Sequence, residues 1–270
     1  MRANPGRIDL HVHSDGSDGR HPPEEVLRRA ARGRLDVLAL TDHDLAPRLE
    51  AGVHVLEGHA VRVLHAAEVS GSHEGREYHL LVYFPGVMPE AYRAFLGGRA
   101  AARAERYDDA VAALGLRDVL APSDAAARAG ARALTRHHLV RALRDAGQVA
   151  DSRAGFARVA GVLAPIALPF PEAIAVARDA GGFPSWAHPD LADAQAHVRA
   201  FAAAGLRGLE GARPRQPRAL RNGLRKLAER HGLLVTGGSD WHGWHEGELG
   251  MFALDGERAE RFMTALERAA

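Results

Sequence analysis

The feature that most constrains the fold is a short stretch near the N-terminus in which apolar and polar residues alternate. In residues 8–13 every second side chain is apolar and the others are Asp9, His11 and His13, which is the period of a β-strand. His11 and His13 therefore point to the same face, where two imidazoles can hold one metal ion. The turn residues that follow bring the carboxylate of Asp18 close to the same place. The stretch predicts a strand ending in a metal site, although a half-buried strand that happens to carry two histidines has the same pattern.

The combination of a buried-type strand and a metal-binding side chain recurs along the chain. Such strands are expected over 35–40, 61–70, 76–84, 183–187 and 233–236. Two of the candidate side chains, Glu68 and His79, lie within these strands. The others follow a strand end, and they are His43, His188, Asp240 and His242. Helical patterns fall over 22–33, 171–180, 193–204, 217–231 and 257–268, and a short strand is expected over 206–210. This alternation predicts an α/β barrel, a fold whose active sites lie at the carboxyl ends of parallel strands.

The middle of the chain has a different character. Helical spacing is expected over 89–114, from residue 121 onward, over 135–143 and over 152–159, and no strand pattern separates these segments. We interpret residues 85–165 as a helical insertion that caps a barrel built from residues 1–84 and 166–270. A run of ordinary barrel helices is the alternative interpretation.

Composition narrows the class of protein. The 270 residues are 46% hydrophobic, which is sufficient for a large core, and 35 basic residues nearly balance 34 acidic ones. That balance argues against a duplex DNA binder. The chain has no cysteine, so disulfides and thiolate metal sites are excluded. No secretory leader or membrane-length apolar run is recognised, and a cytoplasmic protein is expected.

The candidate ligands form one set of imidazoles and carboxylates. They are His11, His13, Asp18, His43, Glu68, His79, His188, Asp240 and His242. Nitrogen and oxygen donors of this kind suit Mn²⁺, Fe²⁺ or Zn²⁺. Because the set exceeds what one ion needs, two or three divalent ions sharing a bridging carboxylate are expected.

These motifs resemble the PHP (polymerase and histidinol phosphatase) family of metal-dependent phosphoesterases. The resemblance rests on residues 9–14 and 17–19, on the Thr-Asp-His-Asp motif at 41–44, on Glu68 and His79, on the Ala-His-Pro motif at 187–189, and on residues 238–243. The spacing from Glu68 to His79, the helical insertion, and Thr135 and Arg136 followed by His138 are most similar to one subgroup. That subgroup acts on AMP, 3′,5′-nucleoside bisphosphates and short RNA 5′ ends, and Asp18 matches it better than the histidinol phosphatase type.

The resemblance implies a distorted (β/α)₇ barrel with a trinuclear centre in which Mn²⁺ is favoured. Matched by motif, the first ion is held by His11, His13, Glu68 and Asp240, the second by Glu68, His79 and His188, and the third by Asp18, His43 and His242. Asp240, His188 and His242 are the residues expected to take part in catalysis.

The expected reaction is hydrolysis of nucleotide phosphomonoesters. The ions would activate a hydroxide for in-line attack on phosphorus and neutralise charge on the phosphoryl oxygens. Arg136 and His138 are expected to orient the phosphate, since a guanidinium matches it bidentately, and Arg20 is a further candidate contact. An ordinary place in the first turn of a helix is the alternative for Arg136 and His138.

Other functions stay open at this point. A 5′–3′ exoribonuclease acting on short single-stranded RNA has the same motifs. A metal-dependent amidohydrolase also uses His-x-His on a barrel strand, although the sole lysine, Lys226, lies in the middle of a predicted helix and far from any strand end. A non-catalytic metal-binding module is the remaining alternative. Residues 161–171 and 211–217 depart from the family pattern, which affects substrate contacts more than metal ligands, and the oligomeric state is not indicated.

Overall fold

The computed structural model describes residues 6–119, 122–244 and 247–268. Its strands are β1 (Arg7–Val12), β2 (Val37–Leu40), β3 (Gly52–Leu56), β4 (His59–His73), β5 (Arg76–Phe84), β6 (Phe183–Trp186), β7 (Gly208–Ala212), β8 (Leu234–Gly237) and β9 (Leu254–Asp255). Its helices are α1 (Pro23–Arg32), α2 (Glu90–Ala113), α3 (Ala125–Arg128), α4 (Arg136–Asp145), α5 (Ser152–Ala160), α6 (Phe170–Asp179), α7 (Leu191–Ala204), α8 (Arg218–Arg230) and α9 (Gly256–Glu267). None of the helices in these ranges has both the length and the hydrophobicity needed to cross a bilayer.

The strands form a nearly closed barrel. Hydrogen-bonded neighbours follow the order β8-β7-β6-β5-β4-β2-β1-β9. The segment after β8 returns to β1, because Asp240 N donates to His11 O at 2.8 Å and His13 N donates to Trp241 O at 2.9 Å. Gly238 permits this approach, since a Cβ there would lie 2.5 Å from the backbone nitrogen of His11. The distorted (β/α)₇ barrel expected from the resemblance is confirmed.

Among the longer strands of the barrel, β5 departs from the parallel arrangement. The pairs β1–β2, β2–β4, β6–β7 and β7–β8 are parallel, whereas β5 is antiparallel to both β4 and β6. Glu74 and Gly75 join β4 to β5 with positive φ angles of 49° and 77°, a tight turn that leaves no room for a crossover helix. His79 lies near the start of β5 and therefore reaches the same end of the barrel as residues that follow the parallel strands.

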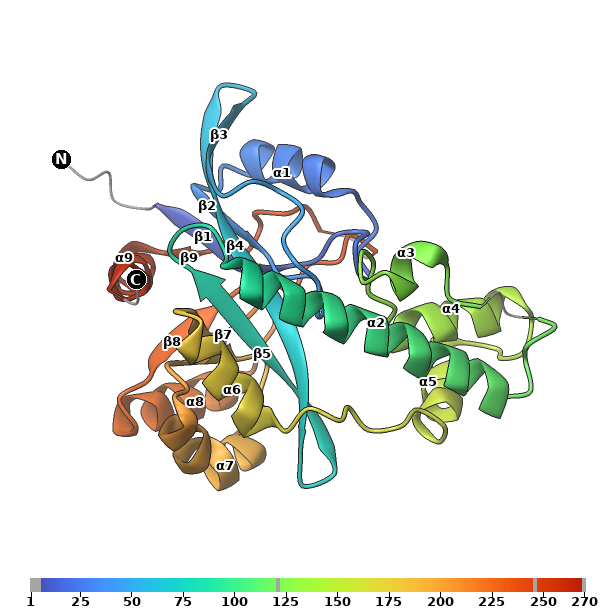
Figure 1. Cartoon of the computed structure of the whole chain (residues 1–270). Helices are drawn as coiled ribbons and strands as arrows, with labels where there is room; N and C mark the ends of the chain where they lie inside the picture. Colours follow the sequence, from blue (N-terminus) through green and yellow to red (C-terminus); the bar gives the residue numbers. More distant parts are fainter. Residues whose placement is uncertain (1–5, 120–121, 245–246, 269–270) are drawn as a thin grey trace.

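Helices cover the barrel unequally (Figure 1). Helices α6, α7 and α8 gather beside β6, β7 and β8, and they share a large apolar core with β4 and β5. Helix α9 contributes Phe262 and Leu266 to a second core that contains Ile8 and Leu10 of β1. The short strands β3 and β9, which the sequence pattern did not indicate, pair antiparallel with β4 and β1 at the barrel's edge.

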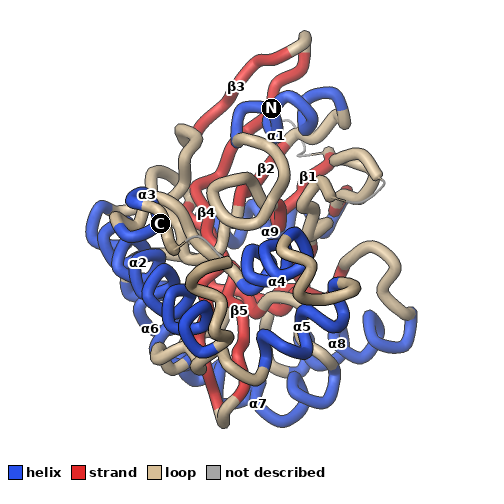
Figure 2. The backbone as a smooth tube through the Cα atoms, turned by 90° about the vertical axis from the view of Figure 1, so that its right-hand side faces the viewer, coloured by secondary structure: helices blue, strands red, loops and turns tan. Residues whose placement is uncertain are grey.

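Helices α2 to α5 form the middle of the chain. Figure 2 shows α4 and α5 in front of the strands when the molecule is viewed from this side. These helices enclose an apolar cluster of their own, which includes Tyr107, Leu139, Leu143 and Val159. No strand lies between Phe84 and Phe183 in the described residues. The boundaries at 84/85 and 165/166 remain a prediction.

Candidate metal centre

Glu68 lies at the centre of the site. It is 1% exposed on β4, where apolar neighbours on both sides favour a strand and turn its carboxylate into the barrel's open end. Its two oxygens face five imidazoles from four separate segments of the sequence. Oε2 lies 3.2–3.3 Å from nitrogens of His11, His13 and His43, and Oε1 lies 3.1 Å from nitrogens of His79 and His188.

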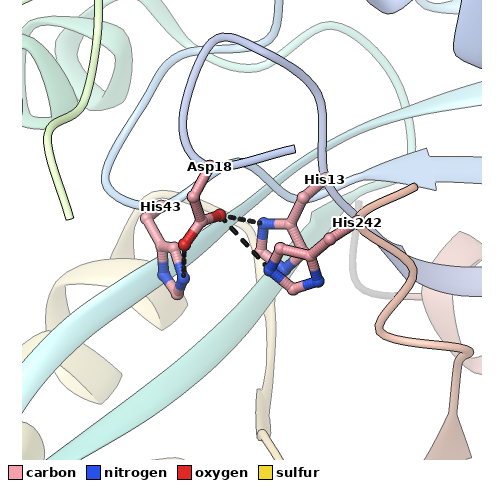
Figure 3. Close-up of side chains that lie close together, drawn as sticks. All are labelled: His13, Asp18, His43 and His242. Atoms are coloured by element: carbon pink, nitrogen blue, oxygen red, sulfur yellow. Dashed lines mark ion pairs between the residues drawn. The ribbon is translucent and has the colours of Figure 1, made fainter. Parts of the chain in front are cut away.

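A second group surrounds Asp18 (Figure 3). The Asp18 carboxylate lies 3.3 Å from His242, 3.6 Å from His43 and 3.7 Å from His13, and the four side chains converge on one point. The turn that carries Asp18 is fixed by Asp42, which accepts hydrogen bonds from Ser14 and Ser17. His13 and His43 face both the Asp18 group and Glu68, so the two groups are continuous.

Asp240 completes the centre from the segment after β8. Its Oδ1 lies 3.4 Å from Nε2 of His11 and 3.4 Å from Nε2 of His13. Its Oδ2 accepts a hydrogen bond from Arg213 at 3.1 Å. Asp240 has a φ of 54°, an uncommon conformation for a residue other than glycine, and its backbone hydrogen bond to β1 helps to hold it there. The structure thus brings all nine predicted ligands together at one end of the barrel.

Opposite charges dominate the electrostatics of this buried centre. Burial raises the pKa values of Glu68 and Asp240, but the neighbouring histidines outweigh it and hold both well below the ordinary range. Burial likewise lowers the pKa values of His13 and His79, yet the surrounding carboxylates raise them to about 10 and about 9. The protein groups therefore favour positive charge on His13 and His79 and negative charge on the acids, whereas burial holds the pKa of His43 well below its ordinary value. A divalent cation would take the place of those protons.

Unsatisfied buried atoms test whether a metal fits. Hydrogen-bond partners are lacking, among the described residues, for His11 Nε2, His13 Nδ1 and Nε2, His43 Nδ1, Asp18 Oδ2 and Glu68 Oε2. Buried polar atoms in this number are costly unless something binds them. Among these atoms, Glu68 Oε2 lies 3.2–3.3 Å from His11 Nε2, His13 Nε2 and His43 Nδ1, which suits donors arranged around shared ions. Imidazole with carboxylate is the donor set of Mn²⁺, Fe²⁺ and Zn²⁺. The residues present therefore fit divalent metals.

Glu210 is a site residue that the sequence reasoning missed. It is fully buried on β7, its Oε1 lies 2.9 Å from Nδ1 of His11, and its Oε2 accepts from the backbone N–H of His188 at 2.8 Å. Glu210 thus orients the imidazole of His11 and holds the backbone of His188, two of the nine candidate ligands. The acid within an apolar strand, which identified Glu68 as a candidate, also occurs here and could have revealed it.

A cavity of about 710 Å³ adjoins the centre. Asp18, His43 and His79 line it on the metal side, and residues of α2, α4 and α5 line it on the other. Arg136 belongs to this lining. The neighbouring His137 does as well, and its exposed ring lies 6.2 Å from the ring of His242.

The other two predicted phosphate contacts lie elsewhere. Nδ1 of His138 accepts a hydrogen bond from the backbone N–H of Thr135 at 3.0 Å, as part of the box that caps α4, and His138 is outside the cavity lining. Arg20 is exposed, and its guanidinium lies 5.9 Å from the ring of Trp244. The roles of His138 and Arg20 toward substrate therefore stay predictions.

Comparison with known proteins agrees with this geometry. The PHP domain model matches residues 9–113. A 3′,5′-nucleoside bisphosphate phosphatase of Chromobacterium violaceum is 31% identical over 89% of this chain and 88% of its own. The 5′–3′ exoribonuclease Rnm of Salmonella typhimurium is 30% identical over 87% of this chain and 84% of its own.

Solved structures give the same picture. A protein described as a metal-dependent phosphoesterase, from Bifidobacterium adolescentis, superimposes with a TM-score of 0.74 at 27% identity over 98% of both chains. A protein described as an amidohydrolase with bound sulfate, from Chromobacterium violaceum, superimposes with a TM-score of 0.72 at 26% identity over 98% of this chain and 97% of that one. The chain therefore belongs to the PHP-domain family, and it is a metal-dependent phosphoesterase.

Proposed function

We propose that the chain hydrolyses phosphomonoesters of nucleotides, of the AMP or 3′,5′-nucleoside bisphosphate type, with Mn²⁺ at the centre described above. The observation that carries this proposal is the cavity of about 710 Å³, which has metal-site residues at one end and an apolar wall at the other. Its size falls within the range of about 300–1,000 Å³ that is usual for small-molecule sites. A phosphate fits the charged end and a base fits the apolar wall.

Three arginines line the cavity, and one of them has no carboxylate partner among the described residues. Arg103 is bound to Asp44, and Arg106 is bound to Glu77 at 2.9 Å, so both already have carboxylate partners. Arg136 lines the same cavity without an ion pair to any described carboxylate, and its guanidinium lies 5.9 Å from the Phe156 ring. We assign phosphate binding to Arg136, with His137 beside it as the second candidate from α4.

The apolar wall comes from α5 and the segment after it. Phe156, Val159, Leu163 and Ile166 line the cavity there. The Phe156 ring also meets His137 edge to face, with centroids 4.9 Å apart. An aromatic ring among aliphatic side chains is suited to a nucleobase, whose faces stack and whose edges hydrogen-bond.

The chemistry follows from the nine ligands. Bound divalent ions would lower the pKa of an attacking water and neutralise charge that develops on the phosphoryl oxygens. The side chains of His188, Asp240 and His242 are 30%, 23% and 23% exposed, whereas those of His11 and His13 are fully buried. The three predicted catalytic residues are thus the more exposed part of the centre, whereas the cavity proposed for the substrate meets the centre at Asp18, His43 and His79.

A second candidate activity is 5′–3′ hydrolysis of short RNA. The observation that favours it lies beside Asp18, whose carbonyl accepts a hydrogen bond from the Trp244 indole at 2.6 Å. Trp244 is 42% exposed, and the Arg141 guanidinium lies 3.9 Å from its ring centroid. Aromatic and cationic groups next to a phosphate site are the usual means of holding a further nucleotide.

The position of the sole lysine argues against an amidohydrolase in which a carbamylated lysine bridges two metal ions. Lys226, the sole lysine, is exposed on α8 and contributes nothing to the centre. No lysine is therefore available to bridge two ions as a carbamate.

Phosphate release tests the proposal. The Mn²⁺-loaded chain is given AMP, 3′,5′-adenosine bisphosphate and a 5′-phosphorylated trinucleotide side by side. We expect release from the mononucleotides, and Arg136→Ala is expected to raise KM more than it lowers kcat. Mononucleotides produced from the trinucleotide would instead establish the exoribonuclease. No release from any of the three substrates would contradict both assignments.

Variants of the ligands test the centre itself. Asp240→Ala and His11→Ala are expected to abolish turnover and to lower the bound Mn²⁺, with the far-ultraviolet circular dichroism unchanged. His54→Ala, on the barrel-edge strand β3, serves as the matched control. An unchanged rate and metal content in both site variants would contradict the ligand assignment.

A further inference from the structure

A second group of metal-binding side chains lies outside the centre described above. His73 ends β4, Glu74 opens the tight turn into β5, and His197 lies on α7. One ligand atom from each of the three lies within 4.8 Å of the others. None of the three is among the nine residues around Glu68 and Asp18.

The geometry of this group suits one shared ion better than direct hydrogen bonds. Nε2 of His73 lies 3.8 Å from Oε1 of Glu74, and Nε2 of His197 lies 4.0 Å from Oε2 of Glu74. These separations are too long for hydrogen bonds. Donors about 2.0–2.2 Å from a tetrahedral ion stand somewhat more than 3 Å apart, so a small closure would complete the arrangement.

The two imidazoles are held in place by packing. The His197 ring stacks on Phe201 with centroids 5.7 Å apart, and the His73 ring meets both Phe201 and His197 edge to face at 5.1 and 5.0 Å. Phe201 itself is fully buried. The side chains of His73 and His197 are 26% and 15% exposed, and that of Glu74 is 70% exposed, so the group opens to solvent on one side.

We propose that His73, Glu74 and His197 form a second divalent-metal site of the zinc class, separate from the phosphoesterase centre. Two imidazoles and one carboxylate are a usual donor set for Zn²⁺, and the open side leaves a fourth position for water. Mg²⁺ and Ca²⁺ prefer sites made of oxygen and would not compete effectively here. The assignment does not depend on which phosphoester the chain cleaves.

A metal ion at this site would link the β4–β5 hairpin to α7, and these two elements are already in contact nearby. Arg76, at the start of β5, pairs with Asp193 in the first turn of α7. An ion on His73, Glu74 and His197 would add a second tie between the hairpin and the same helix. The hairpin also contributes Glu77 to the substrate cavity and His79 to the metal centre. Zinc would therefore steady one wall of the cavity without entering it.

Zinc content and hairpin protection test the inference. The full chain and the His73→Gln/His197→Gln variant are dialysed to equilibrium against the same buffered free Zn²⁺, and zinc per chain is measured by mass spectrometry. We expect the variant to bind one equivalent less and to retain Mn²⁺-dependent phosphoesterase activity. Hydrogen exchange in the β4–β5 turn is expected to slow with Zn²⁺ in the unchanged chain only.

Two further variants keep the test decisive. Glu74→Gln changes an exposed turn residue, so it should fold normally, and it is expected to weaken zinc binding at this site at least tenfold. The control variant is His54→Gln. His54 belongs to β3, which lies far from the β4–β5 turn in Figure 1, so this variant should bind zinc like the unchanged chain. Equal zinc content and equal exchange in all chains would overturn the proposal.

Discussion

Glu210 positions two histidines of the metal centre, although it is not itself one of the nine predicted ligands. It meets Nδ1 of His11 and the backbone N–H of His188, which leaves Nε2 of His11 directed at Glu68 and Asp240. Glu210→Gln keeps the volume but removes the charge that favours this tautomer. We expect about 10- to 100-fold weaker Mn²⁺ binding, measured by titration calorimetry.

The matched control for this change is Glu229→Gln, because Glu229 is 59% exposed on α8 and pairs only with Arg225 among the described residues. It should bind Mn²⁺ like the unchanged chain. If Glu210→Gln also bound Mn²⁺ with unchanged affinity, the orienting role of Glu210 would be refuted.

At the same scale, sequence reasoning succeeds where a residue type is distinctive and fails where it is common. Histidines at strand ends stand out, so the imidazoles of the centre were all anticipated. Arg103 and Arg106, which line the cavity, were not, because Arg supplies all but one of the 35 basic residues and a single arginine then carries little information. Only the packing of α2 against the barrel distinguishes them.

Helix α2 is attached to the barrel through a buried ion pair. Arg103 is 5% exposed, its Nε donates to Asp44 Oδ2 at 2.5 Å, and Asp44 is completely buried beside His43. Arg103→Ala leaves that carboxylate buried with only the more distant Arg99, 4.0 Å away, as a cationic partner. Breaking a buried ion pair costs about 3–5 kcal/mol in comparable cases. We expect a clear fall in the thermal unfolding temperature.

Two further variants distinguish loss of the Arg103–Asp44 ion pair from a general destabilisation of α2. Glu105→Ala changes an exposed residue of α2 and should leave the unfolding temperature nearly unchanged. Adding Asp44→Asn to Arg103→Ala removes the buried charge that has lost its Arg103 partner and should restore part of the loss. An Arg103→Ala chain as stable as the Glu105→Ala chain would show that the ion pair does not anchor α2.

The cap of α4 gives a pH-dependent prediction. Burial lowers the pKa of His138 to about 4, outweighing the Asp18 carboxylate, which raises it. An unfolded histidine takes up its proton near pH 6.5, so between pH 6.5 and about 4 the unfolded chain binds more protons than the folded one. The free energy of unfolding should therefore fall as the pH decreases through this window, and His138 should contribute no such dependence above it.

His138→Gln isolates this contribution, because glutamine at the same position can cap the helix and does not titrate. Chemical denaturation in the presence of a chelator should show the unchanged chain losing stability relative to the variant as the pH falls from 6.5 to about 4. Parallel pH profiles for the two chains would rule out the buried neutral state of His138.

Helices and strands were predictable from the sequence where a single hydrophobic periodicity runs through the segment. They were less predictable where a tight turn determines whether a strand forms and which way it runs. The strands and helices of the barrel follow clear patterns and occur in the expected order. Strand β3 was missed although Glu57 and Gly58, with positive φ angles of 52° and 74°, form a tight turn between it and β4. Its side chains Val53 and Val55 are 68% and 74% exposed, so no burial pattern accompanies it. The reversed direction of β5 likewise depends on the two-residue turn at Glu74 and Gly75.

At the scale of the whole molecule, the order of the motifs carries most of the information about the site. Ligands spread from His11 to His242 can meet only if the strands that carry them close into a ring, which is why the barrel and the centre were predicted together. The cavity is different, because its far wall comes from α4, α5 and the segment after them. How those helices lie against the barrel depends on tertiary contacts such as Arg103 with Asp44, which no local pattern reveals.

The centre is expected to stabilise the whole fold when metal is bound. Its ligands come from β1, β4 and β5 and from the segments after β1, β2, β6 and β8, so an ion there links nearly the whole circumference of the barrel. A ligand that binds only the folded chain adds about 2.7 kcal/mol at one hundred times its Kd. Chelation should therefore lower the thermal unfolding temperature, and Mn²⁺ should restore it.

Three chains determine which site is responsible for this stabilisation. The unchanged chain and the His73→Gln/His197→Gln variant should respond to Mn²⁺ alike, whereas Asp240→Ala should respond weakly because it has lost a ligand of the centre. Differential scanning calorimetry with chelator and then with excess Mn²⁺ makes the comparison. If Asp240→Ala regained as many degrees as the unchanged chain, the stabilising ion would have to lie outside the centre, and the link between metal binding and barrel closure would be lost.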